Sequence, residues 1–313
     1  MTIKVLEPGP LTTVQDVGRW GRQSLGVPVA GPMDSVSHRL ANLAVGNAEA
    51  CATLEVTLNG PTLEFRRELW FAVTGADFEL RLDETVVPIG VAHQARRGSV
   101  LRFGSRVAGA RAYIGVRGGF DVPLVLGSRS TDLASGFGGL GGRRLRAGDL
   151  LAVGTDAQTA PRPVSQVPFP LPHGGATIRV IGARPDDDDG TRCGEDAMTR
   201  LATTRFTLAA ESNRMGYRLT GPPLRLADET PLLSAPTLCG TVQVPPSGQP
   251  ILLMADRQTT GGYPRIATVI SADLPRVGQL APGDWIRFEW CDRPAAVAAL
   301  IAQQQTLMRT VSW

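Results

Sequence analysis

The segment QVPPSGQPILLMADRQTTGGYPRIATV (residues 243–269) carries an apolar, strand-like run into a polar turn and then begins a second apolar run. The turn holds a compact polar cluster before two glycines and Tyr263, namely Asp256, Arg257, Gln258, Thr259 and Thr260. An ordinary turn needs Gly, Asn or Asp and gains nothing from Arg-Gln-Thr-Thr. A carboxylate, a guanidinium, an amide and two hydroxyls can together bind an amide and a carboxylate. The segment therefore predicts a strand that ends in a ligand-binding cluster.

Apolar runs of strand length recur along the rest of the chain. They are ELWFAVTG (68–75), ARAYIGV (110–116), VPLVLG (122–127), ATIRVIGA (176–183), QPILLMA (249–255) and IATVISA (266–272). The composition agrees with them, because the chain has 36 Gly and 24 Pro while aromatic residues make up only 5%. Such a mixture favours many short strands joined by turns over long helices. A mainly β fold is therefore predicted.

A proline-rich stretch divides the chain, whose 313 residues suffice for two lobes. Residues 161–175 contain five prolines and end in Gly174 and Gly175. Proline lacks the amide hydrogen that a central strand needs, so this stretch is interpreted as a linker. The expected organisation is an N-terminal lobe over 1–160 and a C-terminal lobe over 176–313, joined by the linker 161–175.

The two predicted lobes resemble one another in three places. PLVLGSRSTD (123–132) resembles PILLMADRQTTGG (250–262), and AGDLLAV (147–153) resembles PGDWIRF (282–288). More faintly, DVGRWGRQSLG (16–26) resembles SNRMGYRLTG (212–221). The order is kept although the spacings differ, which suggests a duplication.

Helices are expected to be few. One begins after Asp34, a good N-cap, and stops near Gly46. Its apolar face has helical spacing and consists of Val36, Leu40, Leu43 and Ala44. Two others are expected over 195–202 and 293–305.

The polar edge of the first helix, within GPMDSVSHRLAN (31–42), is a candidate site. Asp34, His38 and Asn42 lie four residues apart on the face opposite the apolar one. A carboxylate, an imidazole and an amide along one edge could hold a polar substrate or move protons. The alternative is an ordinary capped surface helix, because such pairs are common on helix surfaces.

The glycine-rich segment GSRSTDLASGFGGLGGRRLRAGD (127–149) is a further candidate. Gly136, Gly138 and Gly141 satisfy the dinucleotide-binding spacing, but no helix is expected to follow them, so that function is rejected. Glycine-rich backbone can still form an anion-binding nest beside Arg143 and Arg144. The alternative is a flexible hairpin loop.

Several function classes have little support. The net charge is +3 and the arginines form no stripe, so no nucleic-acid partner is expected. The four cysteines form no CxxC pair, and DDDDG (186–190) lacks the spacing of a calcium loop, so no metal is expected. No signal-peptide or membrane segment is seen, which predicts a cytoplasmic protein without membrane contact. Lys4 is the only lysine, so no Walker A motif exists.

These motifs, in this order, resemble the family that includes 5-oxoprolinase C subunits, biotin-dependent carboxyltransferase-like proteins and allophanate hydrolase subunit 2. The resemblance covers nearly the whole chain and is carried by GPMDSVSHRLAN, NGPTLEF (59–65), GSRSTD, SNRMGYRL, QVPPSGQP and DRQTTGGYP. It implies two cyclophilin-like β-barrel lobes with a few short helices, together forming one carboxyltransferase-type module. One departure is ARPDDDDGTRCG (183–194), where the family usually has Gly-Pro and an aromatic. It bears on partner choice if this loop contacts the substrate or a partner.

The resemblance implies an enzyme subunit that is active only with partners. With a kinase-inhibitor-like B subunit and a separate A subunit, the C subunit hydrolyses 5-oxo-L-proline to L-glutamate at the expense of ATP, held by the complex with Mg. No biotin is expected on this chain. Two alternatives stay open. One is the urea or amide carboxyltransferase component of a biotin-dependent enzyme, and the other is a regulatory protein that binds a kinase-inhibitor-like partner.

Site residues follow from the family motifs by position. Those expected to be catalytic are Asp34, His38, Asp132 and Asp256. Those expected to bind substrate are Asn42, Arg129, Arg214, Gln243, Arg257, Gln258, Thr259 and Tyr263. The ESNRMGYR segment (211–218) is expected to form a wall of the same pocket. The helix edge at Asp34 is expected to face the 256–264 segment across a cleft.

Overall fold

The computed structural model describes residues 2–155, 159–161, 163–164, 168–183, 188–227 and 232–311. The chain divides into two compact units. An N-terminal unit comprises Met1–Trp20, Ala30–Leu171 and Thr306–Trp313, and a C-terminal unit comprises Gly21–Val29 and Pro172–Gln305. The main division falls between Leu171 and Pro172, inside the proline-rich stretch. Each unit also contains a short piece from the far end of the chain, which composition alone does not reveal.

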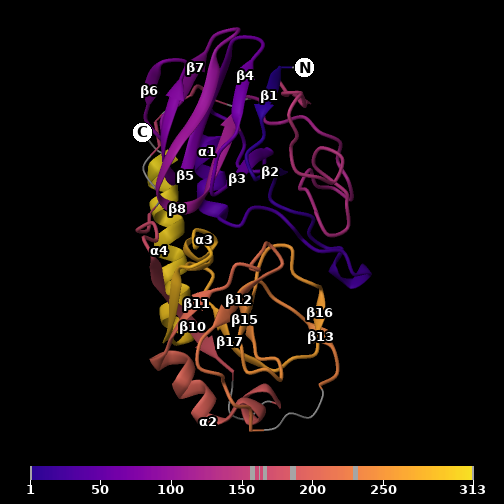
Figure 1. Ribbon diagram of the computed structural model, residues 1–313, viewed down its shortest axis with the longest axis vertical. Coiled ribbons are helices and arrows are strands. Elements are labelled where there is room, and N and C mark those ends of the chain that lie inside the picture. The colour runs from indigo at the N-terminus through magenta and orange to yellow at the C-terminus, as the bar shows by residue number, and fades with distance from the viewer. Residues whose placement is uncertain are drawn as a thin grey trace. The chain divides into compact units, whose positions relative to one another are not determined.

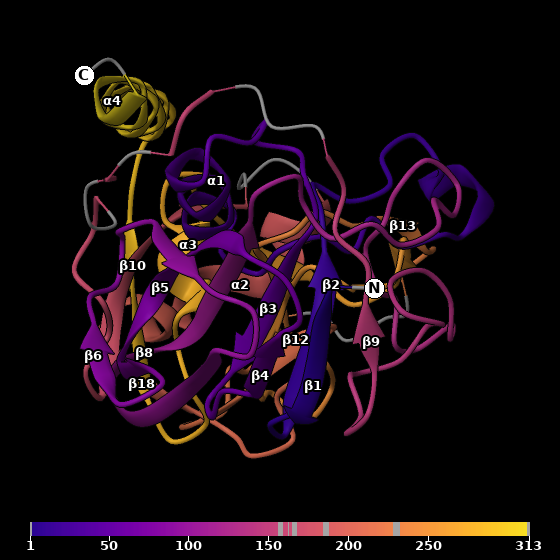
Figure 2. The same cartoon turned by 90° about the horizontal axis from the view of Figure 1, so that it is seen from above.

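The N-terminal unit is built on a nine-stranded sheet in the order β2-β3-β8-β4-β1-β9, with β5 paired to β6, β7 and β8 (Figure 1). Its strands are β1 (Ile3–Glu7), β2 (Leu11–Gln15), β3 (Thr53–Thr57), β4 (Thr62–Phe65), β5 (Leu69–Leu82), β6 (Thr85–Val87), β7 (His93–Ala95), β8 (Val100–Val116) and β9 (Leu150–Leu151). The helix α1 (Ser35–Ala44) packs on β5, β8 and β3 (Figure 2). The predicted apolar face of α1 is also buried, but its Val36 and Leu40 pack with Leu307, Val164 and Phe169 and not with the sheet.

The longest strands of this sheet, β5 and β8, include the predicted runs 68–75 and 110–116, which are confirmed. The run 122–127 is not a strand, so that prediction is wrong. It makes only an isolated bridge between Val125 and Ser128. Pro123 has no amide hydrogen for a ladder, and Leu126 adopts a positive φ of 53° that no strand tolerates.

The C-terminal unit contains a closed barrel in the order β10-β17-β14-β15-β12-β11-β18. Its strands are β10 (Gly175–Gly182), β11 (Arg205–Leu208), β12 (Gly216–Thr220), β14 (Thr241–Gln243), β15 (Ile251–Leu253), β17 (Arg265–Val269) and β18 (Trp285–Trp290), beside a small sheet of β13 (Ala235–Pro236) and β16 (Thr260–Gly261). Along β10 the buried residues alternate, so that Ala176, Ile178 and Val180 fill the barrel. The runs at 176, 249 and 266 are confirmed as β10, β15 and β17.

The mainly β fold is confirmed, with one closed barrel and, in the N-terminal unit, a half-barrel sheet. The Gly-Asp turns of the two lobes precede β9 and β18, as the repeat predicts. The other helices are η1 (Gln23–Leu25), α2 (Asp188–Thr203), α3 (Leu274–Gly278) and α4 (Arg293–Val311), so both remaining helix predictions are confirmed. At 19 residues α4 is longer than expected, whereas α2 is interrupted at Gly194, whose φ of 68° and ψ of 165° are not helical, so its second part begins where the sequence predicts.

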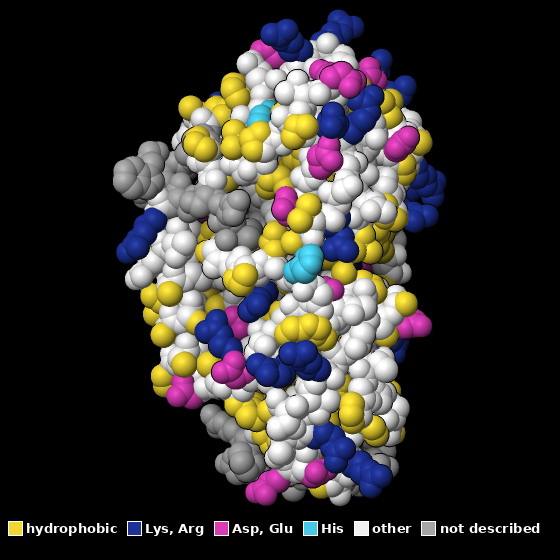
Figure 3. Space-filling view, turned by 60° about the vertical axis from the view of Figure 1, so that its left-hand side comes forward, with side chains coloured by type: hydrophobic (Ala, Val, Ile, Leu, Met, Phe, Trp, Pro, Cys, Tyr) yellow, Lys and Arg dark blue, Asp and Glu magenta, His cyan; other side chains and the backbone are white. Residues whose placement is uncertain are grey.

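The acidic stretch DDDDG lies only partly within the described residues. Asp186 and Asp187 fall outside them, as does part of the 183–194 departure, whereas α2 begins at Asp188. The end of this stretch is therefore helical. Over the residues that the structure describes, no helix is long and apolar enough to cross a membrane. On the face drawn in Figure 3, basic side chains are interspersed with acidic and apolar ones.

Candidate functional site

The C-terminal barrel carries a pocket of about 260 Å³ beside β12, β14 and β15. It is lined by Asn213, Met215, Gly216, Arg218, Gln243, Ile251, Leu253, Gln258 and Tyr263. Three residues predicted from the sequence, Gln243, Gln258 and Tyr263, therefore come together here. The predicted wall segment 211–218 also contributes, but through Asn213, Met215, Gly216 and Arg218.

Two amide groups converge in this pocket next to Gly261. A Cβ atom placed on Gly261 would lie 2.8 Å from Nε2 of Gln258 and 2.9 Å from Nε2 of Gln243. Gln243 is only 2% exposed, and its Nε2 has no hydrogen-bond partner among the described residues. A buried donor left unsatisfied costs about 1–3 kcal/mol. A ligand oxygen is the simplest partner for a donor kept in this state.

The backbone of β14 explains how Gln243 reaches the pocket. The pairing of β14 with β17 shifts register between Val242 and Gln243. Such an irregularity redirects a side chain and ends regular pairing. Pro245 and Pro246 follow after Val244 and cannot extend the strand. The motif QVPP thus places an amide at the end of a barrel strand.

Arg257 is a second unusual group of the 256–264 segment, although it does not line the pocket. It is 8% exposed, and its Nε has no hydrogen-bond partner among the described residues. Burial lowers the pKa of the Arg257 guanidinium, an effect opposed by the charge of Cys239. A buried guanidinium is costly unless an anion pairs with it. The substrate role predicted for Arg257 stays a prediction. Thr259 does not line the pocket either, and its carbonyl accepts a hydrogen bond from the amide of Thr237.

Arg214 and Asp256 form a buried two-point ion pair. Nε of Arg214 lies 2.8 Å from Oδ2 of Asp256, and Nη2 lies 2.9 Å from Oδ1. Both residues are 3% exposed. Neither lines the pocket, so the geometry favours a positioning role over the direct contacts expected from the sequence. The pair ties the loop before β12 to the turn that holds Gln258.

In the N-terminal unit, the polar edge of α1 is buried, so the surface-helix alternative is wrong. Asp34 caps the helix: its Oδ1 accepts a hydrogen bond from the Ser37 amide at 2.9 Å, and Oδ2 accepts one from the Ser37 hydroxyl. The amide of Asp34 donates to the hydroxyl of Tyr113, which donates to Glu55. Glu55 and Tyr113 were not predicted, because in sequence each is one polar residue within an ordinary strand.

The other two residues of this edge have different partners. Asn42 donates to the carbonyls of Glu49 and Cys51 and accepts from Asn47, which gives it a structural role. His38 is fully buried; Nδ1 lies 2.9 Å from the Thr53 hydroxyl, and Nε2 has no partner among the described residues. Burial lowers the pKa of His38 to about 4, although Asp16 and other acidic groups raise it. His38 is therefore neutral near pH 7.

This burial predicts a pH-dependent stability. The unfolded chain takes up a proton on His38 near pH 6.5, whereas the folded chain resists it until about pH 4. The contribution of His38 to the free energy of unfolding is therefore fully present above about pH 6.5. It is lost as the pH drops toward 4, by up to about 3 kcal/mol. Urea unfolding at pH 7.5 and 5.0 should show the loss, and His38→Gln should reduce it. If His38→Gln keeps the full pH dependence, other groups cause it; the exposed His173→Gln serves as control.

The GSRSTD segment encloses the carboxylate of Asp16. Asp16 accepts hydrogen bonds from the hydroxyls of Ser128 and Ser130 and from the amide of Arg129. The Arg129 side chain donates to the Val122 carbonyl at 2.9 Å and to Asp121 at 3.2 Å. These contacts give Arg129 a structural role. Arg129 lines neither of the two pockets formed by described residues, so its predicted substrate role stays a prediction.

Asp132, predicted to be catalytic, caps the next turn. Its Oδ1 accepts hydrogen bonds from the amides of Ala134 and Ser135, while its buried Oδ2 has no partner among the described residues. The sequence echo between lobes also has a structural counterpart. Arg19 donates to the carbonyl of Ser130, just as Arg214 binds the corresponding segment of the other lobe. Each lobe therefore anchors its polar segment, at 128–132 or at 256–260, with a buried arginine.

The fold and the pocket define a mainly β module in which a closed barrel presents an amide-lined cavity. A family model described as the carboxyltransferase domain, subdomains A and B, matches residues 25–290. The chain belongs to this family.

Relatives extend over nearly the whole chain. It is 41% identical over 313 residues to the C subunit of the 5-oxoprolinase of Escherichia coli (strain K12), covering 99% of this chain and 98% of the relative. It is 40% identical to the corresponding 5-oxoprolinase C subunit of Haemophilus influenzae, covering 92% and 90%. Among solved structures, the urea carboxylase of Kluyveromyces lactis matches with a TM-score of 0.92 at 33% identity, covering 99% of this chain and 29% of that one.

Proposed function

We propose that this chain is the C subunit of an ATP-dependent 5-oxoprolinase, which hydrolyses 5-oxo-L-proline to L-glutamate. The observation that carries the proposal is the 41% identity to a 5-oxoprolinase C subunit over almost the full length of both chains. The urea carboxylase match is more distant and covers only 29% of that enzyme. It keeps a urea or amide carboxyltransferase as the second candidate.

The chemistry of the barrel pocket suits a small cyclic amide with a carboxylate. The side-chain amides of Gln243 and Gln258 provide donors for the lactam oxygen and acceptors for the lactam N–H. Arg218 also lines the pocket, and its guanidinium has no hydrogen-bond partner among the described residues, so it is suited to the substrate carboxylate. The arginine that binds the substrate carboxylate is therefore Arg218, which was not predicted from the sequence.

The reaction must overcome amide resonance, which makes an unactivated lactam a poor electrophile. Transfer of a phosphoryl group from ATP to the lactam oxygen gives an imidate-like phosphate and ADP. Water then adds to the carbon, the ring C–N bond breaks, and the nitrogen takes up a proton. A second water releases phosphate from the resulting acyl phosphate. The donors at Gln243 and Gln258 would stabilise the charge that develops on the lactam oxygen.

The proposal includes partners. The enzyme is completed by a kinase-inhibitor-like B subunit and a separate A subunit, and ATP with Mg is held by the assembled complex. This chain carries no biotin. Its four free cysteines suit a reducing, cytoplasmic setting.

The test is to purify the chain with its A and B partners and follow ATP-dependent glutamate release from 5-oxoproline. Gly261→Ala should lower kcat/KM at least about tenfold, because the added methyl displaces the two amide nitrogens. Gly262→Ala is the matched control, since its Cβ would approach the Leu232 carbonyl at 3.0 Å and neither glutamine. A folded complex without activity contradicts the proposal, and carboxylation of urea with a biotinylated carrier supports the second candidate.

A further inference from the structure

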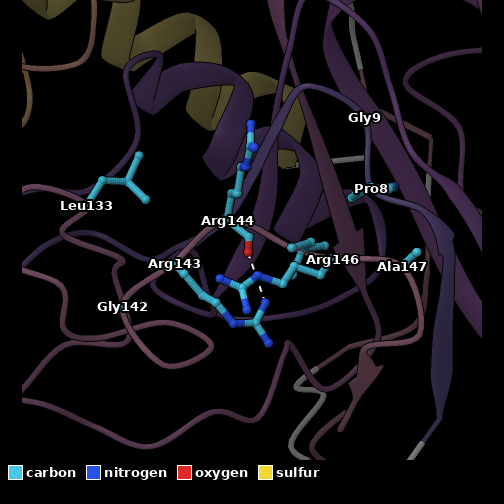
Figure 4. Close-up of a pocket in the computed structure, with 9 residues that line it drawn as sticks. Pro8, Gly9, Leu133, Gly142, Arg143, Arg144, Arg146 and Ala147 are labelled. Carbon is cyan, nitrogen blue, oxygen red and sulfur yellow. Dashed lines mark hydrogen bonds between the residues drawn. The ribbon is translucent and has the colours of Figure 1, made fainter.

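A second pocket, of about 580 Å³, lies in the N-terminal unit at the end of the glycine-rich segment. It is lined by Pro8, Gly9, Leu133, Gly142, Arg143, Arg144, Leu145, Arg146 and Ala147 (Figure 4). Three arginines in four consecutive residues therefore line one cavity. None of these residues contributes to the barrel pocket, and the proposed hydrolysis gives them no role.

One carboxylate builds the shape of this pocket. Oδ2 and Oδ1 of Asp149 lie 2.8 Å from Nη1 and Nη2 of Arg143, respectively. Oδ2 of Asp149 also accepts a hydrogen bond from the Arg146 amide at 2.7 Å, and Nη1 of Arg143 donates to the Arg144 carbonyl at 3.0 Å. The hydrogen bonds between the two side chains raise the pKa of Arg143 and lower that of Asp149. Asp149 thus fixes the turn and neutralises one of the three guanidinium groups.

Neither Arg144 nor Arg146 forms an ion pair with a described residue, although the charge of Arg146 also helps to lower the pKa of Asp149. Arg144 donates from Nη1 to the carbonyl of Pro10 at 2.8 Å, and the Arg146 guanidinium has no hydrogen bond to any described residue. Figure 4 shows the guanidinium groups of Arg143 and Arg146 turned toward the same place, while the Arg144 side chain points away from them. Three guanidinium groups against one carboxylate leave the lining of this pocket with a net positive charge, which favours binding of an anion.

We propose that this pocket binds the oligophosphate group of a small molecule, either free oligophosphate or the phosphate tail of a nucleotide. Guanidinium forks match phosphate oxygens at two points each. A single carboxylate would satisfy one fork and leave the second charge unpaired. Because Arg144 and Arg146 point in different directions along a cavity of about 580 Å³, two or more linked phosphates fit this lining better. The inference needs no hydrolytic activity, since it concerns binding by this chain alone.

Calorimetric titration of the purified full chain with inorganic triphosphate, ATP and adenosine tests the inference. Triphosphate and ATP should bind at one site, weaken with added NaCl, and lose affinity about tenfold in both Arg144→Ala and Arg146→Ala. Adenosine should not bind. A tenfold preference for ATP over triphosphate identifies a nucleotide as the source, whereas equal affinities show that free oligophosphate suffices.

Arg67→Ala is the matched control, because Arg67 is exposed between β4 and β5 and lies outside the pocket. It should leave triphosphate affinity unchanged. Absence of saturable phosphate binding overturns the proposal, as does equal weakening by Arg67→Ala or equally tight binding of glutarate, a dicarboxylate. Because all three substitutions are at surface side chains, unchanged thermal unfolding is expected and should be verified for each variant.

Discussion

Replacement of Gln243 by methionine is expected to lower kcat/KM for glutamate release about a hundredfold without destabilising the protein. The buried Nε2 of Gln243 has no partner among the described residues, so its removal breaks no hydrogen bond to them. Methionine has a similar length and fills the same space. A glutamine kept for stability would behave in the opposite way, because its loss would unfold the barrel and affect turnover only through the amount of folded protein.

The measurement pairs steady-state kinetics of the assembled complex with urea unfolding of the chain. Gln305→Met is the matched control, since Gln305 is an exposed residue of α4 and lies outside the pocket. It should leave both quantities unchanged. If Gln243→Met turns over at the wild-type rate, Gln243 has no part in the mechanism. The proposed contact to the lactam oxygen then loses its central donor.

The sequence predicts much of the barrel pocket because local signals coincide there. The QVPP motif ends a strand at Gln243, and the glycines after Gln258 leave space that a side chain would fill. Both signals are local in sequence, and both amides do meet in the pocket. The same reasoning places the strands and the cap at Asp34, since strand alternation and capping depend on neighbouring residues.

The sequence does not predict which polar residues turn inward. Arg214 and Arg218 stand four residues apart in one motif, yet Arg214 binds Asp256 inside the protein while Arg218 lines the pocket. Strand alternation after Gly216 decides this, together with a carboxylate 42 positions later in the chain. Burial of the polar edge of α1 could likewise not be predicted from the sequence, because its partners Tyr113 and Glu55 lie on distant strands.

Replacement of Asp256 by alanine is expected to cost about 3–5 kcal/mol of unfolding free energy, the largest stability effect we predict. The substitution leaves the guanidinium of Arg214 buried without its two-point partner. Asp196→Ala is the matched control, because its pair with Arg200 spans 3.5 Å, is exposed at both side chains, and is worth under about 1 kcal/mol. Urea unfolding at neutral pH measures both losses.

A double variant separates positioning from chemistry at this pair. Arg214→Met combined with Asp256→Leu removes both charges, and apolar replacement of a buried pair is often neutral or stabilising. We therefore expect it to regain most of the stability lost in Asp256→Ala, and most of the turnover, because neither side chain lines the pocket. Recovery of stability without turnover would instead assign Asp256 the catalytic role that its motif predicts. A loss below about 1 kcal/mol in Asp256→Ala would show that the ion pair does not hold the turn carrying Gln258.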